Sequence, residues 1–230
     1  AIRRAVAMAV DQRDYLRAVA GDDPAGWGVC EGVFTCDTPL ANEDGSDALK
    51  VRNIERAKAA LQAAGYNGEK VVLIAPGEYP QINALSMMTA DIIRRLGMNL
   101  ELIAADWGTL VQRRTSKEPV ERGGWSIIHT TSSGQSLALP VFHLFLRANG
   151  ANAWFGWPDV PEVERLRGEW VEKGGDPAES RRIALALNRA AMESMYYVPL
   201  GYYWQPSAWR RNVTGAFRAP ATVFWNIGKS

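Results

Sequence analysis

The residues closest to a catalytic arrangement are His129 and the serines that follow it. Histidine can act as a general base toward a serine hydroxyl, so His129 with Ser132 or Ser133 could supply a base and a nucleophile. Such a pair needs a third group that orients the histidine, and the nearby sequence offers no obvious carboxylate. We therefore expect His129 to be structural or to contact a ligand, and a hydrolase is the alternative.

Cys30 and Cys36 are the only cysteines, and they lie in a loop without helix or strand periodicity. A disulfide between them would close a small loop, contribute about 2 kcal/mol and imply an oxidising compartment. The alternative is two unrelated buried thiols. His129 and His143 could in principle join the cysteines around zinc, but the spacing matches no recurrent metal pattern, so we expect no metal site.

Other motifs for catalysis or cofactor binding are incomplete. Residues 134–138, Gly-Gln-Ser-Leu-Ala, miss the last glycine of a Gly-x-Ser-x-Gly elbow. Gly26-Trp27-Gly28 lacks the third glycine of a dinucleotide fingerprint, and the final Gly-Lys-Ser lacks the earlier glycine of a phosphate loop. We expect no bound cofactor.

Charge and hydropathy exclude two further classes. The net charge of +1, from 26 basic and 25 acidic residues, leaves no electrostatic footprint for nucleic acid. No apolar run approaches the ~20 residues that span a bilayer, and no signal peptide is visible. The chain begins inside a predicted helix without a cap, so we expect a fragment whose targeting segment would lie upstream.

The remaining candidates for a functional site are aromatic and small polar residues at strand ends and in loops. Residues of these kinds line clefts that bind small molecules. The competing explanation is burial in the core, which we expect for Trp125, Trp170 and about half of the others. The aromatic residues concerned are Trp107, Trp125, Trp154, Phe155, Trp157, Tyr202, Tyr203 and Trp204.

The elements that must position these side chains begin with an apolar strand at residues 71–74. Apolar residues at helical spacing predict a helix over 80–96, and a second strand covers 99–104. A helix capped by Asp106 and a third strand at 125–128 follow. Strands alternating with helices predict an α/β fold with a mostly parallel sheet, whose carboxyl ends carry the ligand site.

The remaining segments read as helices flanking this sheet, with strands near the end of the chain. The helices are expected at residues 2–10, 11–20, 53–64, 140–146, 159–170 and 177–195, and the strands at 198–204 and 223–227.

Several segments, in this order and spacing, resemble the extracellular solute-binding proteins of ABC importers, of the dipeptide- and oligopeptide-binding class. The segments are Arg3-Arg4-Ala5-Val6-Ala7-Met8-Ala9-Val10-Asp11, the helix ending in Ala64-Gly65-Tyr66, Leu96-Gly97-Met98-Asn99-Leu100-Glu101-Leu102 with Asp106-Trp107, Gly124-Trp125 and Pro199-Leu200.

This resemblance implies a type II periplasmic-binding-protein fold and a periplasmic or lipid-anchored receptor without bond chemistry. Residues 1–204 would form the C-terminal ligand-binding lobe, and residues 205–230 a tail that returns towards the missing N-terminal lobe. The expected partners are a peptide or other small solute, the permease subunits and the missing lobe. A standalone sensor or chaperone lobe is a further alternative.

Relatives that bind peptides usually anchor the ligand's amino group on an aspartate after the Gly-Trp strand or in the loop before the next helix. Residues 126–136 contain no acid, and we interpret Asp159 as a helix cap. The expected ligand-binding residues are Tyr79, Trp107, His129, Thr130, Thr131, Ser132, Asn149, Trp154, Phe155, Trp157, Tyr203 and Trp204. Because these groups are uncharged, we expect this lobe to prefer uncharged ligand groups.

Overall fold

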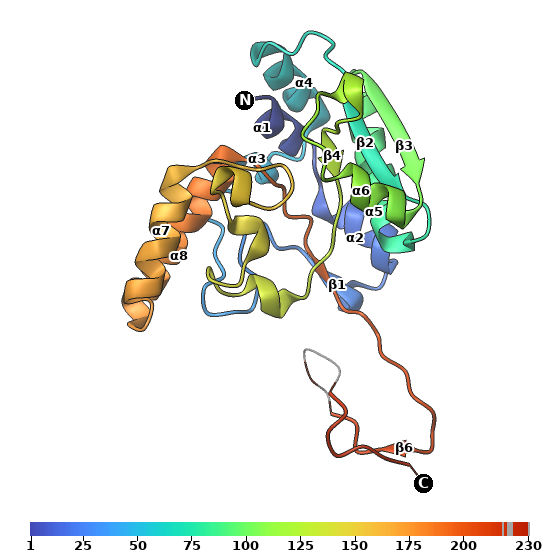
Figure 1. The fold of residues 1–230 in the computed structure, drawn as a ribbon, viewed down its shortest axis with the longest axis vertical. Coiled ribbons are helices and arrows are strands. Elements are labelled where there is room, and N and C mark those ends of the chain that lie inside the picture. Colours follow the sequence, from blue (N-terminus) through green and yellow to red (C-terminus); the bar gives the residue numbers. More distant parts are fainter. Residues whose placement is uncertain (218, 220–222, 230) are drawn as a thin grey trace.

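The structure, a computed structural model, describes residues 1–217, 219 and 223–229. One side of the structure carries a three-stranded parallel sheet in which β2 (Val71–Pro76) lies between β3 (Leu100–Ala105) and β4 (Ile127–Ile128) (Figure 1). Leu73 of β2 lies opposite both Leu102 and Ile127. The parallel sheet is as predicted, although its third strand is shorter than residues 125–128.

Two helices cover opposite faces of this sheet. Because alternate side chains of a strand point to opposite sides, Val71 packs with α5 (Pro80–Arg95), whereas Val72 packs with Leu110 of α6 (Trp107–Arg113). Asp106 caps α6 by accepting the Thr109 N–H, as predicted. The residues predicted to form the buried face of α5 are at most 6% exposed, namely Ile82, Leu85, Ile92 and Leu96.

Helices from both ends of the chain complete the fold. The N-terminal segment forms α1 (Ile2–Ala7), α2 (Gln12–Ala20), α3 (Asp47–Lys50) and α4 (Ile54–Ala63). Asp11 and Asn53 cap α2 and α4 as predicted, by accepting backbone N–H groups. After β4 the chain forms α7 (Pro161–Lys173) and α8 (Pro177–Ser194), which pack against each other.

The predicted cap at Asp159 is wrong. The first helical residue of α7 is Pro161, and the capping position belongs to Val160, which makes no side-chain bond. Proline suits that first position because its missing N–H has no intrahelical partner there. Asp159 instead faces Asn149 in an isolated antiparallel bridge.

The predicted helix at residues 140–146 is also wrong. The chain there makes turns and one short 3₁₀ helix, η4 (Leu144–Leu146). The reason is the side chain of His143, whose Nδ1 accepts the Leu146 N–H and closes a single turn. Other 3₁₀ turns are η1 (Pro24–Gly26), η2 (Val120–Arg122), η3 (Gly134–Leu137) and η5 (Gly150–Asn152).

The C-terminal strands pair in two small antiparallel ribbons. Within the predicted strand at 198–204, only β5 (Tyr202–Tyr203) is a strand, and it pairs with β1 (Trp27–Gly28). The predicted strand at 223–227 is wrong, because those residues lead through a turn to β7 (Gly228–Lys229), which pairs with β6 (Val213–Thr214). Among the described residues, no helix is long and apolar enough to cross a membrane.

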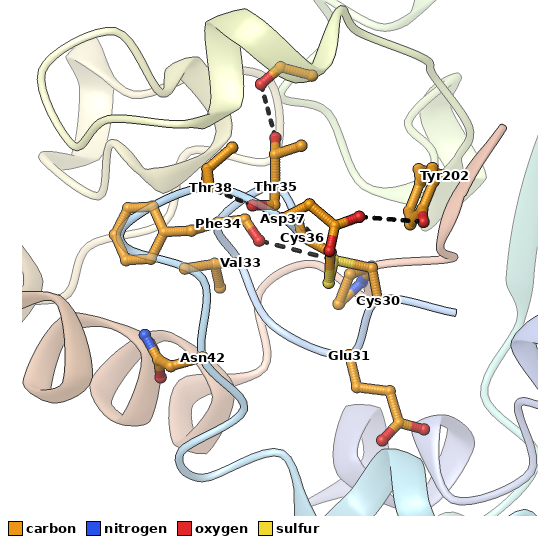
Figure 2. Close-up of a disulfide and its surroundings, with 12 residues drawn as sticks. Cys30, Glu31, Val33, Phe34, Thr35, Cys36, Asp37, Thr38, Asn42 and Tyr202 are labelled. Atoms are coloured by element: carbon orange, nitrogen blue, oxygen red, sulfur yellow. Dashed lines mark hydrogen bonds between the residues drawn. A yellow bond between two sulfur atoms is a disulfide. The ribbon is translucent and has the colours of Figure 1, made fainter. Parts of the chain in front are cut away.

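Cys30 and Cys36 form a disulfide with 5.8 Å between their Cα atoms, as predicted (Figure 2). The loop it closes is largely buried, with Val33 at 4% and Phe34 at 1% exposed. Side chains that are distant in sequence form hydrogen bonds with the backbone of this loop. Asn188 of α8 accepts the Val33 N–H, and His143 Nε2 lies 2.7 Å from the Val33 carbonyl oxygen.

Replacing both cysteines with alanine should lower the free energy of unfolding by about 2 kcal/mol, because the unfolded chain would lose a short loop constraint. Urea unfolding of the purified protein measures this loss. A reducing agent should lower the urea concentration at which half of the unaltered protein is unfolded, and it should leave this midpoint unchanged in the double variant. Two free thiols in the unreduced, denatured protein would contradict the disulfide.

Candidate functional site

Two predicted ligand-binding residues, Tyr79 and Trp107, meet at the carboxyl ends of β2 and β3. Their ring centroids lie 4.6 Å apart, and Tyr79 is 42% exposed. The pairing of these strands continues past β2, since the Gly77 N–H donates to the Ala105 carbonyl oxygen. Glu78 then accepts the backbone N–H of Trp107 at 3.1 Å, which fixes the two strand ends to each other.

Two carboxylates lie beside the uncharged residues predicted at this edge, and the preference for uncharged ligand groups stays a prediction. Glu78 is exposed beside the two rings, and Asp106 lies at the end of β3. Hydrogen bonds from Thr109 hold the pKa of Asp106 below its usual value, and these bonds engage both of its carboxylate oxygens. The sequence does not single out Glu78, because it lies in the turn beyond β2 and its contact with Trp107 depends on the pairing of the two strand ends.

The loop at residues 149–157, which is rich in aromatic residues, contacts the same surface through the guanidinium of Arg114. The Arg114 guanidinium lies 4.5 Å from the ring centroid of Phe155 and 5.9 Å from that of Trp107. Trp154 packs edge-on to Phe155 at 5.1 Å, and Trp157 lies 6.3 Å from Trp125. Cation–π contacts of this kind fasten the loop along α6.

Asn149 begins this loop, and its side chain is incompletely satisfied. The Oδ1 atom of Asn149 is buried and accepts no hydrogen bond from the described residues. A buried amide oxygen without a donor is unfavourable, so Asn149 Oδ1 lowers the stability of this loop rather than being open to a ligand from outside.

His129 is turned away from the serines that follow it. Its Nε2 lies 2.8 Å from the Thr89 hydroxyl, which in turn lies 2.7 Å from the Tyr15 hydroxyl, and its Nδ1 lies 3.2 Å from the Ser86 hydroxyl. Ser86 donates its proton to the Ile82 carbonyl oxygen, so it accepts from His129 Nδ1–H. The remaining bonds then run from Tyr15 to Thr89 to Nε2.

This network fixes His129 as a structural residue. Burial lowers the pKa of His129 to about 4, so the ring is neutral at physiological pH. Ser132 bonds to Ser136 at 2.8 Å, and Ser133 caps η3. The base and nucleophile pair required by the hydrolase alternative is therefore not formed.

The polar segment that includes Thr130, Thr131 and Ser132 leads to the disulfide loop. The Thr35 hydroxyl donates to the Gly134 carbonyl oxygen at 2.6 Å (Figure 2). Thr131 and Ser132 are exposed, and Thr130 is half-buried. This part of the predicted site is thus positioned by the loop that the disulfide closes.

Tyr203 and Trp204 lie in and just after the β1–β5 ribbon. Trp204 is 67% exposed, and its ring lies 5.8 Å from that of Tyr202. Tyr203 is opposite Trp27 and, by strand alternation, points to the other side of the ribbon from Tyr202. Tyr202 also donates a hydrogen bond to Asp37 at 3.4 Å, and Figure 2 shows this contact.

The predicted residues therefore form four groups rather than one. Tyr79, Trp107 and the 149–157 loop lie along α6, and His129 lies against α5. The polar segment lies with the disulfide loop, and Tyr203 and Trp204 lie in and after the β1–β5 ribbon. A surface hollow of about 240 Å³ lies elsewhere, between Val141 and α7. Across residues 1–217, 219 and 223–229, no group of three or more His, Cys, Asp or Glu residues could hold a metal ion.

No family model matches this sequence. The chain is 32% identical over 229 residues to a probable peptide ABC transporter periplasmic-binding protein of Sinorhizobium fredii, covering 99% of the chain and 43% of that relative. It is 26% identical over 237 residues to di/tripeptide-binding protein 2 of Pseudomonas aeruginosa, covering 96% of the chain and 41% of the relative. The chain thus spans about two fifths of the length of these curated relatives.

Solved structures share the fold. A clavulanic acid biosynthesis oligopeptide binding protein has a TM-score of 0.74 at 19% identity, over 100% of this chain and 43% of that one. A dipeptide binding protein of Pseudoalteromonas, in complex with Met-Leu, has a TM-score of 0.72 at 16% identity, and the match covers 100% of this chain and 45% of that one. The periplasmic binding protein MelB of Agrobacterium fabrum, in complex with stachyose, has a TM-score of 0.66 at 16% identity, and the match covers 87% of this chain and 33% of that one. These structural likenesses confirm the predicted fold class, and the two sequence relatives confirm the resemblance to solute-binding proteins.

Lowering the pH from 7 to 5 should destabilise the fold. Burial lowers the pKa of His143, which is 1% exposed, to about 4, against about 6.5 in the unfolded chain. The unfolded chain therefore binds the proton first, and the stability contributed by neutral His143 is complete above about pH 6.5 and lost as the pH falls towards 4. Urea unfolding should show a loss of roughly 2 kcal/mol from this residue between pH 7 and pH 5.

The matched variant is His143→Gln, whose amide can still donate to the Val33 carbonyl oxygen and accept the Leu146 N–H but does not titrate. Its stability should change less across this pH range. An equally steep fall in the variant would show that His143 does not carry the acid sensitivity.

Proposed function

We propose, because this chain is homologous to the periplasmic-binding proteins of peptide ABC transporters, that it forms one lobe of a solute receptor. The observation that carries this proposal is the 32% identity that extends over 99% of the chain. In this function the two lobes close on a solute and deliver it to a membrane permease. The receptor would work in the periplasm, and the Cys30–Cys36 disulfide suits that oxidising compartment.

Residues 1–204 would be the C-terminal ligand-binding lobe, and residues 205–230 would return to the other lobe. In Figure 1 the tail leaves the body of the structure and forms the β6–β7 ribbon at a distance from the helices. Trp209, Phe224 and Trp225 in the described part of the tail are 56% to 78% exposed. Exposed aromatic side chains of this size suit burial against the remaining three fifths of a protein as long as the relatives.

The ligand would be a peptide or another small polar solute held at the carboxyl ends of the strands. Tyr79, Trp107 and Trp204 would supply aromatic walls, while Thr131 and Ser132 would supply hydrogen bonds. Asn149, whose Oδ1 is buried, would border this surface. The remaining predicted contacts are His129, Thr130, Trp154, Phe155, Trp157 and Tyr203, which would support or border this surface.

Binding rather than bond cleavage is the proposed activity. The relatives are named as binding proteins, and both ring nitrogens of His129 are already engaged by hydroxyl groups. The full-length receptor that contains this chain should therefore bind a di- or tripeptide saturably and release it intact. Isothermal titration calorimetry against dipeptides, tripeptides and neutral oligosaccharides, followed by mass analysis of the recovered ligand, measures both properties.

In the same titrations, Trp107→Ala should weaken binding roughly tenfold or more, because an aromatic wall is removed from the cleft. The control is Trp170→Phe on α7, which keeps most of a ring packed beside α8 and should leave the affinity unchanged. Ligand cleavage that is abolished by His129→Ala would overturn the receptor proposal and support the hydrolase.

A further inference from the structure

We infer that Arg114 is a positioning residue of the ligand site: it fixes the Trp107 ring against the loop at residues 149–157 and thereby favours ligands that carry an aromatic side chain. This inference rests on the proposed receptor function, in which Trp107 is a wall of the cleft, and it names the ligand side chain that this wall selects. Arg114 does not contact the ligand itself and is not among the residues predicted from the sequence.

Trp107 and Arg114 lie on the same face of α6. Trp107 is the first residue of the helix and Arg114 directly follows its last, so about two helical turns separate them. Their Cα atoms are therefore about 10 Å apart along the helix axis. The Arg114 side chain covers much of this distance, because helical side chains point back towards the N-terminus, and its guanidinium carbon lies 5.9 Å from the centroid of the Trp107 ring.

The Arg114 guanidinium is held by aromatic rings rather than by carboxylates. The Phe155 ring centroid lies 4.5 Å from it, and no Asp or Glu in the described part of the chain forms an ion pair with it. Its Nε is buried and has no hydrogen-bond partner among those same residues. No stronger contact therefore competes with the two rings for this cation, and partial burial strengthens its attraction to them.

The loop that supplies Phe155 is attached to the rest of the protein by its side chains. Among the described residues, the backbone hydrogen bonds of 151–157 stay within the loop. Trp157 has a φ of 46°, a strained value for so large a residue, and such strain persists only where surrounding contacts maintain it. The side-chain contacts of Phe155 and Trp157 thus determine where this loop lies, and the contact with Arg114 transmits its position to Trp107.

Trp107 needs this support because its ring is only half-buried. Part of the ring packs beside Leu110 in the small core on this face of the sheet, and it also meets the Tyr79 ring, which is 42% exposed. Packing between two aromatic rings depends on the angle between them. A wall that is already fixed at one angle binds a ligand ring more tightly, because less ordering is required on binding, whereas a methyl group is insensitive to that angle.

The test compares Ala-Phe with Ala-Ala by calorimetry on the full-length receptor and its Arg114→Gln variant, which keeps an unbranched polar side chain but removes the charge. The unaltered receptor should bind Ala-Phe more tightly than Ala-Ala. Arg114→Gln should weaken the binding of Ala-Phe roughly fivefold and that of Ala-Ala less than about twofold. Without ligand, hydrogen exchange of residues 151–157 should be roughly fivefold faster in this variant.

Three further variants separate positioning from a general loss of structure. Arg114→Lys keeps the cation and should retain most of the preference for Ala-Phe. Phe155→Leu removes the ring that faces Arg114 and should reduce the preference as Arg114→Gln does, with little further effect when the two are combined. Arg122→Gln makes the same change of charge at an exposed residue of η2 that pairs with Glu118, and it should alter neither the preference nor the exchange.

The results that would overturn the inference differ in what else they affect. Equal weakening of both peptides by Arg114→Gln would show that Arg114 supports the fold as a whole. An unchanged preference in a folded Arg114→Gln variant with faster exchange would show that Arg114 only fastens the loop, and the receptor function would stand in both cases. Binding of neither Ala-Phe, Ala-Ala nor any other peptide would contradict the proposed peptide receptor together with this inference.

Discussion

The structure depends on satisfying the backbone of one buried irregular loop. Residues around Cys30 lie inside the protein without a helix or strand to pair their N–H and C=O groups, and each unpaired group would cost about 1 to 3 kcal/mol. Gln12, which is 2% exposed, forms hydrogen bonds with both backbone groups of Cys30. Its Oε1 accepts the Cys30 N–H, and its Nε2 donates to the carbonyl oxygens of Cys30 and Pro199. One side chain of α2 thereby joins the disulfide loop to the segment before β5.

The same loop ties together elements that are distant in sequence. Asn188, fully buried in α8, accepts from Val33 and donates to Asp44, while buried Glu31 pairs with Arg52. The disulfide alone closes only a short segment, so these long-range bonds, rather than the covalent link, place the loop within the fold. Thr35 and Asp37 at the surface therefore belong to a loop whose buried part is hydrogen-bonded to α2 and α8, although the loop is irregular in structure.

The parts of the fold that could be predicted from sequence are those decided by local periodicity. The apolar run of β2 and the spacing of Ile82, Leu85 and Ile92 in α5 specify their elements without reference to the rest of the chain. Residues 140–146 were misassigned because the His143 ring, anchored 110 positions away at Val33, decides their conformation. The position of Tyr79 and Trp107 could be predicted for the same reason, because strand ends locate them. The direction of the His129 ring could not, because it depends on contacts with α5.

The exposure of the candidate residues has a physical meaning for a protein that spans two fifths of its relatives' length. Trp204 and Tyr79 would be unfavourable on a surface that stayed in water, since burying such a ring is worth about 1.5 to 3 kcal/mol. In the proposed receptor, one lobe would orient a solute through exposed polar groups such as Thr131 and Ser132, but it would leave the solute's other side in water. Closure of a second lobe would bury these rings and the solute together, and excluding water would strengthen the solute's polar contacts. The free energy of binding and that of lobe closure would then both come from burying the exposed rings, and closure could bring separate groups of candidate residues onto one solute.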